Sequence, residues 1–444
     1  MSAAPDLHGH AVPMRTFAPG DEVDAVVIGT GASGAPLLAR LAQAGLKVVA
    51  LEAGPFYVPT RDFATDERAQ SYLFWNDERL SAGADPIGFG RNNSGCGVGG
   101  STLHFTAYTP RPQPDDFHLR TEFGVGQDWP IGYEDLEPYF DELETFLGVS
   151  GPNPYPWGPP RKSSYPLPPL PLNPAARSMQ KAYAALSSSY YQEEVGWRAA
   201  YANRGFCQAG CSLGAKASMD QTFIPLALHH GAEVRAECFV RGFEQDASRR
   251  ITGAIYRRTA SPNPMRQRCR RVFLCTGAVE TPRLLLIMEL ANSSGQVGRN
   301  FMAHVGVQVW GQLEAETRPY QGIPGGLISE DTHRPKDADF TRGYLLQSLG
   351  VMPVTYISQY TRATGTWGPV LKDHMAGYNR VIGINVLGEC LPSERNYLEL
   401  SDEKDAQGLP KPRIHFTAGQ NERLMRELWA LAGAEAVWAY GRST

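Results

Sequence analysis

The chain has 444 residues, of which 42% are hydrophobic and 20% are charged, and its formal net charge is −4 at pH 7. This length exceeds one ordinary domain and fits two or three, each with a buried core. The weak negative charge gives no support for a nucleic-acid-binding protein, and no apolar run approaches the ~20 residues of a membrane-spanning helix. The N-terminus lacks the apolar segment of a signal peptide. The default expectation is therefore a cytoplasmic protein, and the alternative is a periplasmic protein exported with a signal-bearing partner.

The stretch from Asp24 to Gly54 has the order of elements that a dinucleotide site requires. A buried-strand pattern, 25–28, leads into Gly29-Thr30-Gly31-Ala32-Ser33-Gly34, a helical pattern follows, and a second strand, 47–51, ends at Glu52. Gly29 allows the tight turn, Gly31 lets backbone approach a pyrophosphate, and Gly34 lets helix and strand pack closely. The helix start offers unpaired N–H groups to phosphate, and Glu52 can accept hydrogen bonds from a ribose hydroxyl.

A second glycine-rich segment, NNSGCGVGGST, covers residues 92–102 and contains Gly95, Gly97, Gly99 and Gly100. Successive N–H groups in such a segment can form an anion-binding nest. A flexible surface loop is the alternative interpretation. Two such loops in one chain, the second leading into His104 and Phe105, favour a large ligand with two parts.

The remaining pattern predicts an α/β fold with a β-rich second half. A capped amphipathic helix is expected over 128–147, and ten prolines between Pro152 and Pro174 predict an extended linker or, preferably, a strap across a neighbouring domain. Thr281 and Pro282 should open a helix as N-cap and first helical residue. The other expected elements are a helix over 221–230, a meander of strands over 233–245, 250–258 and 271–275, strands near 305–313, 343–349 and 381–387, a hairpin over 392–413, and a helix over 421–440.

Four blocks of this sequence together resemble the glucose–methanol–choline (GMC) flavoprotein oxidoreductases, and in particular the bacterial branch with the flavoprotein subunits of gluconate, sorbitol and fructose dehydrogenases. The blocks are VVIGTGASGAPLLARLAQAGLKVVALEAGP (26–55), GVGGSTLHFTAYTPR (97–111), GFCQAGCSLGAKASM (205–219), and CTGAVETPRLLL (275–286) with VGRNFMAH (297–304). They occur in the family's order and cover the chain from about Val26 onward.

The resemblance implies a Rossmann-like FAD-binding domain with a β-meander, and a mixed α+β substrate domain built from insertions. In the family the first block, with Gly29, Gly31, Ser33, Gly34 and Glu52, holds the adenosine half of FAD. The second, with Gly97, Gly99, Gly100 and Ser101, lies along the pyrophosphate and isoalloxazine. The fourth, with Gly277, returns to the FAD domain. The implied division is 20–115 and 201–304 for FAD binding, 116–200 for a helical and proline-rich insertion, 305–420 for the β-rich substrate domain, and 421–444 for the start of a C-terminal block.

One histidine and two pairs of residues allow more specific hypotheses. His104 matches a histidine that some family members join covalently to the flavin, whereas in many relatives this position only packs against the ring. Cys207 and Cys211 lie where some subunits hold an iron–sulfur cluster, but a cluster needs three or four thiolates, so two cysteines without metal are the favoured interpretation. His229 and His230 have no third ligand at zinc spacing, so no metal site is predicted.

The family's last block, which carries the catalytic histidine, does not appear in the sequence. The resemblance therefore implies a GMC-type oxidoreductase that passes hydride from the CH–OH group of an alcohol, sugar or polyol to flavin N5, and that is truncated as this chain alone. No catalytic residue is assigned. The expected partners are a small-molecule substrate and a cytochrome, a small subunit or a complementing C-terminal chain. The alternatives are a non-catalytic flavin-binding remnant and, last, an NAD-dependent dehydrogenase.

Overall fold

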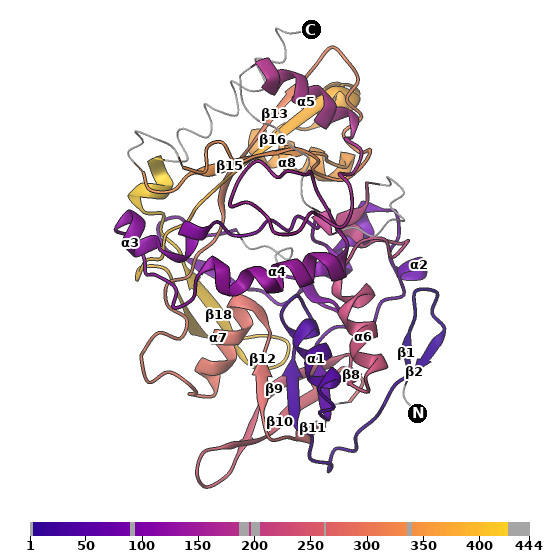
Figure 1. Ribbon diagram of the computed structural model, residues 1–444, viewed down its shortest axis with the longest axis vertical. Helices are drawn as coiled ribbons and strands as arrows, with labels where there is room; N and C mark the ends of the chain where they lie inside the picture. The colour runs from indigo at the N-terminus through magenta and orange to yellow at the C-terminus, as the bar shows by residue number, and fades with distance from the viewer. Residues whose placement is uncertain are drawn as a thin grey trace. The chain divides into compact units, whose positions relative to one another are not determined.

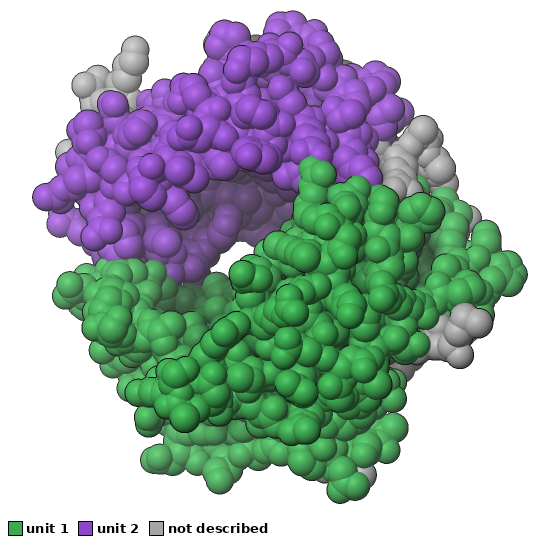
Figure 2. Space-filling model, turned by 60° about the horizontal axis from the view of Figure 1, so that its bottom comes forward, with its two compact units in different colours: residues 1–105, 208–301, 393–417 green, residues 106–207, 302–392, 418–444 purple. Residues whose placement is uncertain are grey.

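The computed structural model describes residues 3–88, 94–185, 195–196, 205–261, 263–334 and 340–424. The chain divides into two compact units, which Figure 2 colours separately. Unit 1 comprises residues 1–105, 208–301 and 393–417, and unit 2 comprises residues 106–207, 302–392 and 418–444. Within the described residues, no helix combines the length and the apolar character that crossing a membrane requires.

Unit 1 is built on a parallel sheet with helices on one face and an antiparallel meander on the other (Figure 1). Its elements are β1 (Ala3–Pro5), β2 (Ala11–Pro13), β3 (Ala25–Ile28), α1 (Gly34–Gln43), β4 (Val48–Leu51), α2 (Pro59–Asp62), β5 (Leu80–Ala82), α6 (Phe223–His229), β8 (Glu233–Arg235), β9 (Cys238–Gln245), β10 (Ile251–Arg258), β11 (Pro264–Arg268), β12 (Val272–Leu274), α7 (Gly277–Ile287), β17 (Tyr397–Lys404) and β18 (Pro410–His415).

The parallel sheet has the strand order β12-β3-β4-β8. Every residue of β3 and β4 is buried, as expected for strands covered on both faces. Side chains alternate between the two faces of a strand, and Val26, Ile28, Val49 and Leu51 pack into a core with the meander. Helix α1 buries Leu38 and Ala39 and contacts β3, β4 and α6. The predicted strand–loop–helix–strand unit is therefore confirmed.

The meander differs from the prediction in which strands it contains. The pattern over 233–245 is interrupted at Glu237, whose φ of +54° turns the chain. The residues before this turn form β8, which joins the parallel sheet beside β4, and those after it form β9. The antiparallel sheet has the order β11-β10-β9. Strand β11, which pairs with β10, was not among the expected strands. Arg266, Arg268 and Arg270 are in fact at least half exposed beside Glu244 and Glu22.

The start of α7 also differs from the prediction. Thr281 and Pro282 do not open the helix, because it begins at Gly277, and Pro282 lies inside it. Gly277 has a φ of +78°, which lets the chain turn directly from β12 into the helix. The Thr281 hydroxyl instead lies 2.9 Å from the hydroxyl of Thr276 at the helix start. The first turn of α7 is thereby placed at the end of the sheet.

The hairpin expected over 392–413 forms as β17 and β18, and it groups with unit 1 rather than with the β-rich region. The reason is a long-range pairing, since β18 runs parallel to β5 with Ile414 opposite Ser81. Leu398 and Ile414 also form a buried cluster with Val279 of α7. The hairpin follows the strand expected over 381–387 closely in the sequence, and this position did not indicate that β18 would pair with β5.

Unit 2 contains an antiparallel sheet of order β13-β16-β15-β14. Its core combines Ile382, Ile384 and Val386 of the sheet with Ala176 and Met179 of a helix. The elements of this unit are α3 (Leu119–Phe123), α4 (Tyr133–Leu147), β6 (Val149–Ser150), α5 (Pro174–Ala185), β7 (Val195–Gly196), β13 (Val305–Gln312), β14 (Ile328–Ser329), β15 (Tyr344–Leu349), α8 (Pro353–Thr364), α9 (Gly368–Ala376) and β16 (Val381–Gly388).

Several elements of unit 2 depart from the expected pattern. The helix expected over 128–147 begins at Tyr133, and the Asp135 side chain accepts a hydrogen bond from the backbone N–H of Gly132. Helices α8 and α9 interrupt the region expected to be β-rich. In the proline-rich stretch, Tyr155 and Trp157 donate hydrogen bonds to Glu330 and Asp331 of the same unit. The helix expected over 421–440 lies outside the described residues from position 425 onward.

Candidate FAD site

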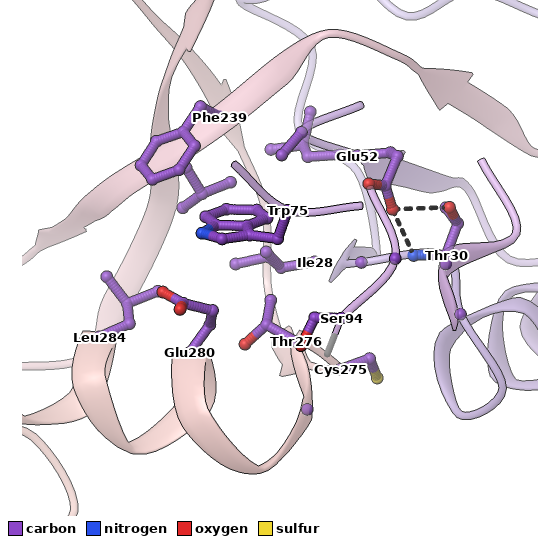
Figure 3. Close-up of a pocket in the computed structure, with 18 of the residues that line it drawn as sticks. Ile28, Thr30, Glu52, Trp75, Ser94, Phe239, Cys275, Thr276, Glu280 and Leu284 are labelled. Atoms are coloured by element: carbon purple, nitrogen blue, oxygen red, sulfur yellow. Dashed lines mark hydrogen bonds between the residues drawn. The ribbon is translucent and has the colours of Figure 1, made fainter. Parts of the chain in front are cut away.

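A cavity of about 360 Å³ opens at the carboxyl ends of β3 and β4 in unit 1. Its walls come from the loop after β3, from the second glycine-rich loop, from β9 and from the first turns of α7 (Figure 3). A cavity at this edge of a parallel sheet is the usual ligand position in doubly wound folds. Predicted site residues that line it are Gly29, Gly31, Ser33, Glu52, Gly100, Ser101 and Gly277.

The two glycine-rich loops pack directly against each other. A Cβ atom on Gly100 would lie 2.7 Å from the Cα of Gly31, and one on Gly29, where φ is +90°, would lie 2.5 Å from the carbonyl oxygen of Cys275. Neither approach leaves room for a side chain. Gly31 has no neighbour closer than 3.7 Å to such a Cβ, so this residue presents bare backbone to the cavity.

Gly34, Gly97 and Gly99 do not line the cavity, and their lack of a side chain instead allows close packing within the loops. A Cβ on Gly34 would lie 2.0 Å from the carbonyl oxygen of Gly29, and one on Gly97 would lie 2.4 Å from the Tyr57 ring. A Cβ on Gly99 would meet the Leu103 side chain at 2.9 Å. These three glycines therefore determine how the loops pack, while Gly31 and Gly100 line the cavity.

Glu52 lies at the end of β4, where the sequence places a ribose-binding carboxylate. One of its oxygens accepts hydrogen bonds from the backbone N–H of Thr30 at 2.9 Å and from the Thr30 hydroxyl at 2.8 Å (Figure 3). The other accepts the N–H of Gly54 at 3.1 Å. Burial raises the pKa of Glu52, and these hydrogen bonds act in the opposite direction. Two carboxylate oxygens offer about four acceptor positions, and a hydrogen bond from the backbone of Gly97 also lowers the pKa of Glu52, so the two glycine-rich loops both hold this carboxylate in place.

A buried network of charges forms the cavity wall opposite Glu52, and sequence reasoning missed it. Arg79 donates to the Ser94 hydroxyl at 2.7 Å and to Glu280 at 3.2 Å. Glu280 also pairs with Arg283 at 3.0 Å, and Arg283 pairs with Asp405 at 2.6 Å. The Arg79, Arg283 and Asp405 side chains are 4%, 3% and 1% exposed. The network links the second glycine-rich loop to α7, and α7 to the turn between β17 and β18.

Two aromatic side chains close another part of the cavity. The rings of Trp75 and Phe239 have centroids 5.9 Å apart, and both residues line the cavity (Figure 3). Together with Ile28 and Leu284 they supply apolar surface next to the polar loops. Trp75 comes from the loop-rich stretch after Gly54, which has no periodic pattern that could have indicated it. Apolar walls with a few placed polar groups are typical of cofactor sites.

His104 lies directly after the second glycine-rich loop but does not line this cavity. Its ring contacts Phe74 with centroids 4.5 Å apart, and its buried Nε2 atom has no hydrogen-bond partner. The fully buried Lys216 side chain donates to the carbonyls of Leu103 at 2.8 Å and Phe105 at 3.2 Å, on either side of His104. Burial, with a smaller contribution from the Lys216 charge, lowers the pKa of His104 to about 4.

This pKa leads to a pH-dependence of stability. An unfolded histidine takes up a proton near pH 6.5, whereas His104 in the folded chain does so only near its pKa of about 4. The unfolded state therefore binds more protons between these values, and folded stability falls as pH decreases from about 6.5 toward 4. We expect His104→Gln to reduce the fall in Tm between pH 7 and pH 5, measured by calorimetry. The matched change His10→Gln, at a side chain that is 78% exposed, should leave that fall unchanged, and an equal response of both variants would contradict the assignment.

The remaining candidate residues lie away from the cavity. Cys207 is buried and Cys211 partly buried, and they belong to different units. Within the described residues, the group with suitable spacing for a metal is Asp115, Asp116 and His333. Its carboxylates already pair with Arg334 and Arg342.

Two other histidines, His374 and His415, also lie outside the lining of the cavity. His374 shares a hydrogen bond of 2.8 Å with the Tyr356 hydroxyl, and His415 pairs with Glu399 at 2.9 Å.

The residues present fit the FAD that the resemblance implies. Bare backbone at Gly31 and Gly100 suits close approach of a pyrophosphate, and Ser33, the residue before α1, lines the same cavity at the helix N-terminus, which favours phosphate. Glu52 lines the cavity at the end of β4, the position of the ribose-binding carboxylate in a dinucleotide site. Trp75 and Phe239 offer flat apolar surface for an aromatic ring system. The second loop adds hydroxyl groups from Ser94 and Ser101.

Comparison with known proteins bears on the family and the fold. Residues 90–306 match the family model described as GMC oxidoreductase. The chain is 29% identical to 2-methyl-1,2-propanediol dehydrogenase of Mycolicibacterium austroafricanum, over 90% of this chain and 78% of that protein. It is 28% identical to the fructose dehydrogenase large subunit of Gluconobacter japonicus, over 93% and 84%.

Among solved structures, a variant of the formate oxidase of Aspergillus oryzae matches with a TM-score of 0.67 and 14% identity, over 96% of this chain and 83% of that one. This likeness shows the fold, which is the α/β FAD-binding fold predicted from the sequence. The match to the family model and the long alignments agree with the resemblance that the four sequence blocks carry. These comparisons support the assignment of the chain to the GMC family of FAD-dependent oxidoreductases.

Proposed function

We propose that this chain binds FAD in the cavity between its two glycine-rich loops and oxidises the CH–OH group of a small alcohol, sugar or polyol. The observation that carries the proposal is the contact of Gly31 with Gly100, which brings both loops to one ligand space beside Glu52. Bound flavin supplies the hydride-accepting chemistry at its N5 atom. The protein's contribution is to hold the cofactor, through the two loops, Glu52, and the wall formed by Arg79 and Glu280.

The proposed substrate class is based on the names of three similar proteins. One relative is named for a diol and another for a sugar, and a further relative is the gluconate 2-dehydrogenase flavoprotein of Pantoea cypripedii. We therefore propose a diol, sugar or sugar acid as the substrate. The fructose dehydrogenase relative is a large subunit, and this supports a further subunit as a partner of the present chain.

Anaerobic titration of the flavin-loaded chain tests this proposal. Addition of a 1,2-diol, fructose or gluconate should bleach the visible flavin bands, with dithionite as the control for complete reduction.

No histidine lines the cavity within the part of the chain that the structure describes, so the proton acceptor is unassigned. For that reason a second function is proposed beside the first: a flavin-binding subunit without catalysis. A chain that holds FAD and is bleached by dithionite but by none of the substrates would have this second function.

A further part of the proposal is that the flavin ring extends past the cavity, whose lining does not include His104, and reaches this histidine. The imidazole is uncharged near pH 7 because its pKa is about 4, and its Nε2 atom has no protein partner. Both features suit a nitrogen that bonds or packs against a flavin ring. Precipitation with acid separates the two cases, because a covalently held flavin stays with the protein pellet. His104→Gln should then release all of the flavin, whereas flavin already fully released from the unchanged chain would establish packing alone.

A further inference from the structure

A second cavity, of about 510 Å³, lies in unit 1 and shares no lining residue with the candidate FAD site. One wall is the N-terminal hairpin of β1 and β2, and another is helix α6. Most of the lining is apolar and comes from residues such as Leu7, Val12, Phe56, Ile224 and Leu228. Neither the family resemblance nor the proposed reaction uses this space.

The carboxylates of Asp6 and Asp220 line the cavity, and the buried Lys216 side chain lies behind the lining, close enough for its charge to act on Asp220. The ionisable residues that line it are Asp6, Asp220, Tyr57 and His229, and among the described residues no Lys or Arg contributes to its wall. The Asp6 carboxylate is engaged in its own turn, where it accepts the backbone N–H groups of His8 and His10 and contacts the His10 ring at 3.0 Å. Asp220 is thus the acidic group with acceptor capacity left for a ligand.

Asp220 has an acceptor atom without a protein partner. Its Oδ2 accepts a hydrogen bond from the Gln221 amide at 2.8 Å, whereas its Oδ1 is buried and has no hydrogen-bond partner. Burial raises the pKa of Asp220, and Ser218, Gln221 and the Lys216 charge act in the opposite direction. A buried carboxylate is costly unless a cation or donor compensates it. The Lys216 charge and the hydrogen bonds from Ser218 and Gln221 compensate part of this cost, and a positively charged ligand group in the cavity would compensate more of it.

The position of Asp220 is fixed by the same loop that borders the FAD site. The backbone N–H of Met219 donates to the Thr102 hydroxyl at 3.0 Å, and that hydroxyl donates to the carbonyl of Gly99 at 2.6 Å. Val98 of this loop also lines the second cavity. The carboxylate is therefore held on a hydrogen-bonded frame rather than on a free surface chain, as a binding residue needs to be.

We propose that this cavity is a binding site for a small organic ammonium ion, with its charged nitrogen at Asp220 and its hydrocarbon part against Phe56, Tyr57 and α6. The carboxylate provides the charge partner, and the two aromatic rings provide apolar contact and cation–π attraction. The apolar walls exclude strongly hydrated inorganic cations, which would lose their water without enough oxygen ligands in return.

Isothermal titration of the full chain with three probes that share a cyclohexane ring tests this site. Cyclohexylammonium should bind, and both cyclohexanol and cyclohexanecarboxylate should bind at least tenfold more weakly. Asp220→Asn should weaken cyclohexylammonium binding tenfold or more, whereas Asp402→Asn, which removes the same charge from an exposed position, should leave it unchanged. Leu228→Trp, which fills the cavity from α6, should abolish binding and serves as a second variant that keeps the carboxylate.

The proposal is overturned if cyclohexanol binds as tightly as cyclohexylammonium, if Asp220→Asn and the unchanged chain bind the ammonium equally, or if none of the three probes binds. Flavin content is measured in the same samples. A folded chain without flavin would contradict the proposed function but would leave this cavity and its test intact.

Discussion

Replacing Gly31 by valine should abolish FAD binding while leaving the chain folded. Gly31 presents bare backbone to the cavity, so an isopropyl group there would occupy the place where a pyrophosphate approaches the loop. The nearest atom to an added Cβ is 3.7 Å away, and φ at Gly31 is not positive, so the backbone can accept a side chain. We expect FAD affinity to fall by at least about a hundredfold, or ~2.7 kcal/mol, in a fluorescence titration of the flavin-free chain.

The matched control is Gly20→Val. Gly20 is exposed, and an added Cβ there would meet nothing within 4 Å. Circular dichroism of both variants verifies folding. If Gly31→Val bound FAD as tightly as Gly20→Val, the cavity between the two loops would not be the pyrophosphate site, and the assignment of the whole cavity would be wrong.

Arg283→Met should be the most destabilising single change in the network beside the cavity. Arg283 pairs with Glu280 and with Asp405, whose side chain is 1% exposed, and also donates to the carbonyl of Pro410 at 2.8 Å. Methionine has a similar length but leaves the buried Asp405 carboxylate without its cation. Removing one partner of a buried ion pair costs about 3–5 kcal/mol, and we expect a Tm lower by several degrees in calorimetry of the flavin-free chain.

An exposed arginine provides the comparison for this loss. Arg268 lies 3.5 Å from Glu22, and the two side chains are 50% and 43% exposed. Because an exposed pair contributes less than about 1 kcal/mol, Arg268→Met should change Tm little. Equal shifts for the two variants would show that the buried network does not stabilise the junction of α7 with the hairpin of β17 and β18.

The sequence predicted those parts of the site that depend on neighbouring residues. The turn from β3 into α1, and Glu52 at the end of β4, follow from a local pattern of buried strand, glycines and helix, and these elements formed as expected. The second glycine-rich loop was likewise visible as a run of small residues. Its contact with the first loop at Gly31 agrees with the expectation of one large ligand with two parts.

Other parts of the site depend on contacts between distant residues, which a local pattern does not contain. Arg79 and Glu280 are 201 positions apart, and Trp75 comes from a loop without periodicity. The hairpin of β17 and β18 joins unit 1 through a pairing with β5, more than 300 residues away. At α7 a strong local signal, Thr281-Pro282, was misleading, because the positive φ of Gly277 allows the helix to begin earlier.

The central claim is that the cavity between the two glycine-rich loops holds FAD, and the visible spectrum of the purified chain after incubation with FAD and gel filtration tests it most directly. The account predicts flavin absorption bands that elute with the protein at about one flavin per chain and that are lost in Gly31→Val but kept in Gly20→Val. A folded chain that elutes without flavin absorption, and that binds NAD instead, would contradict it.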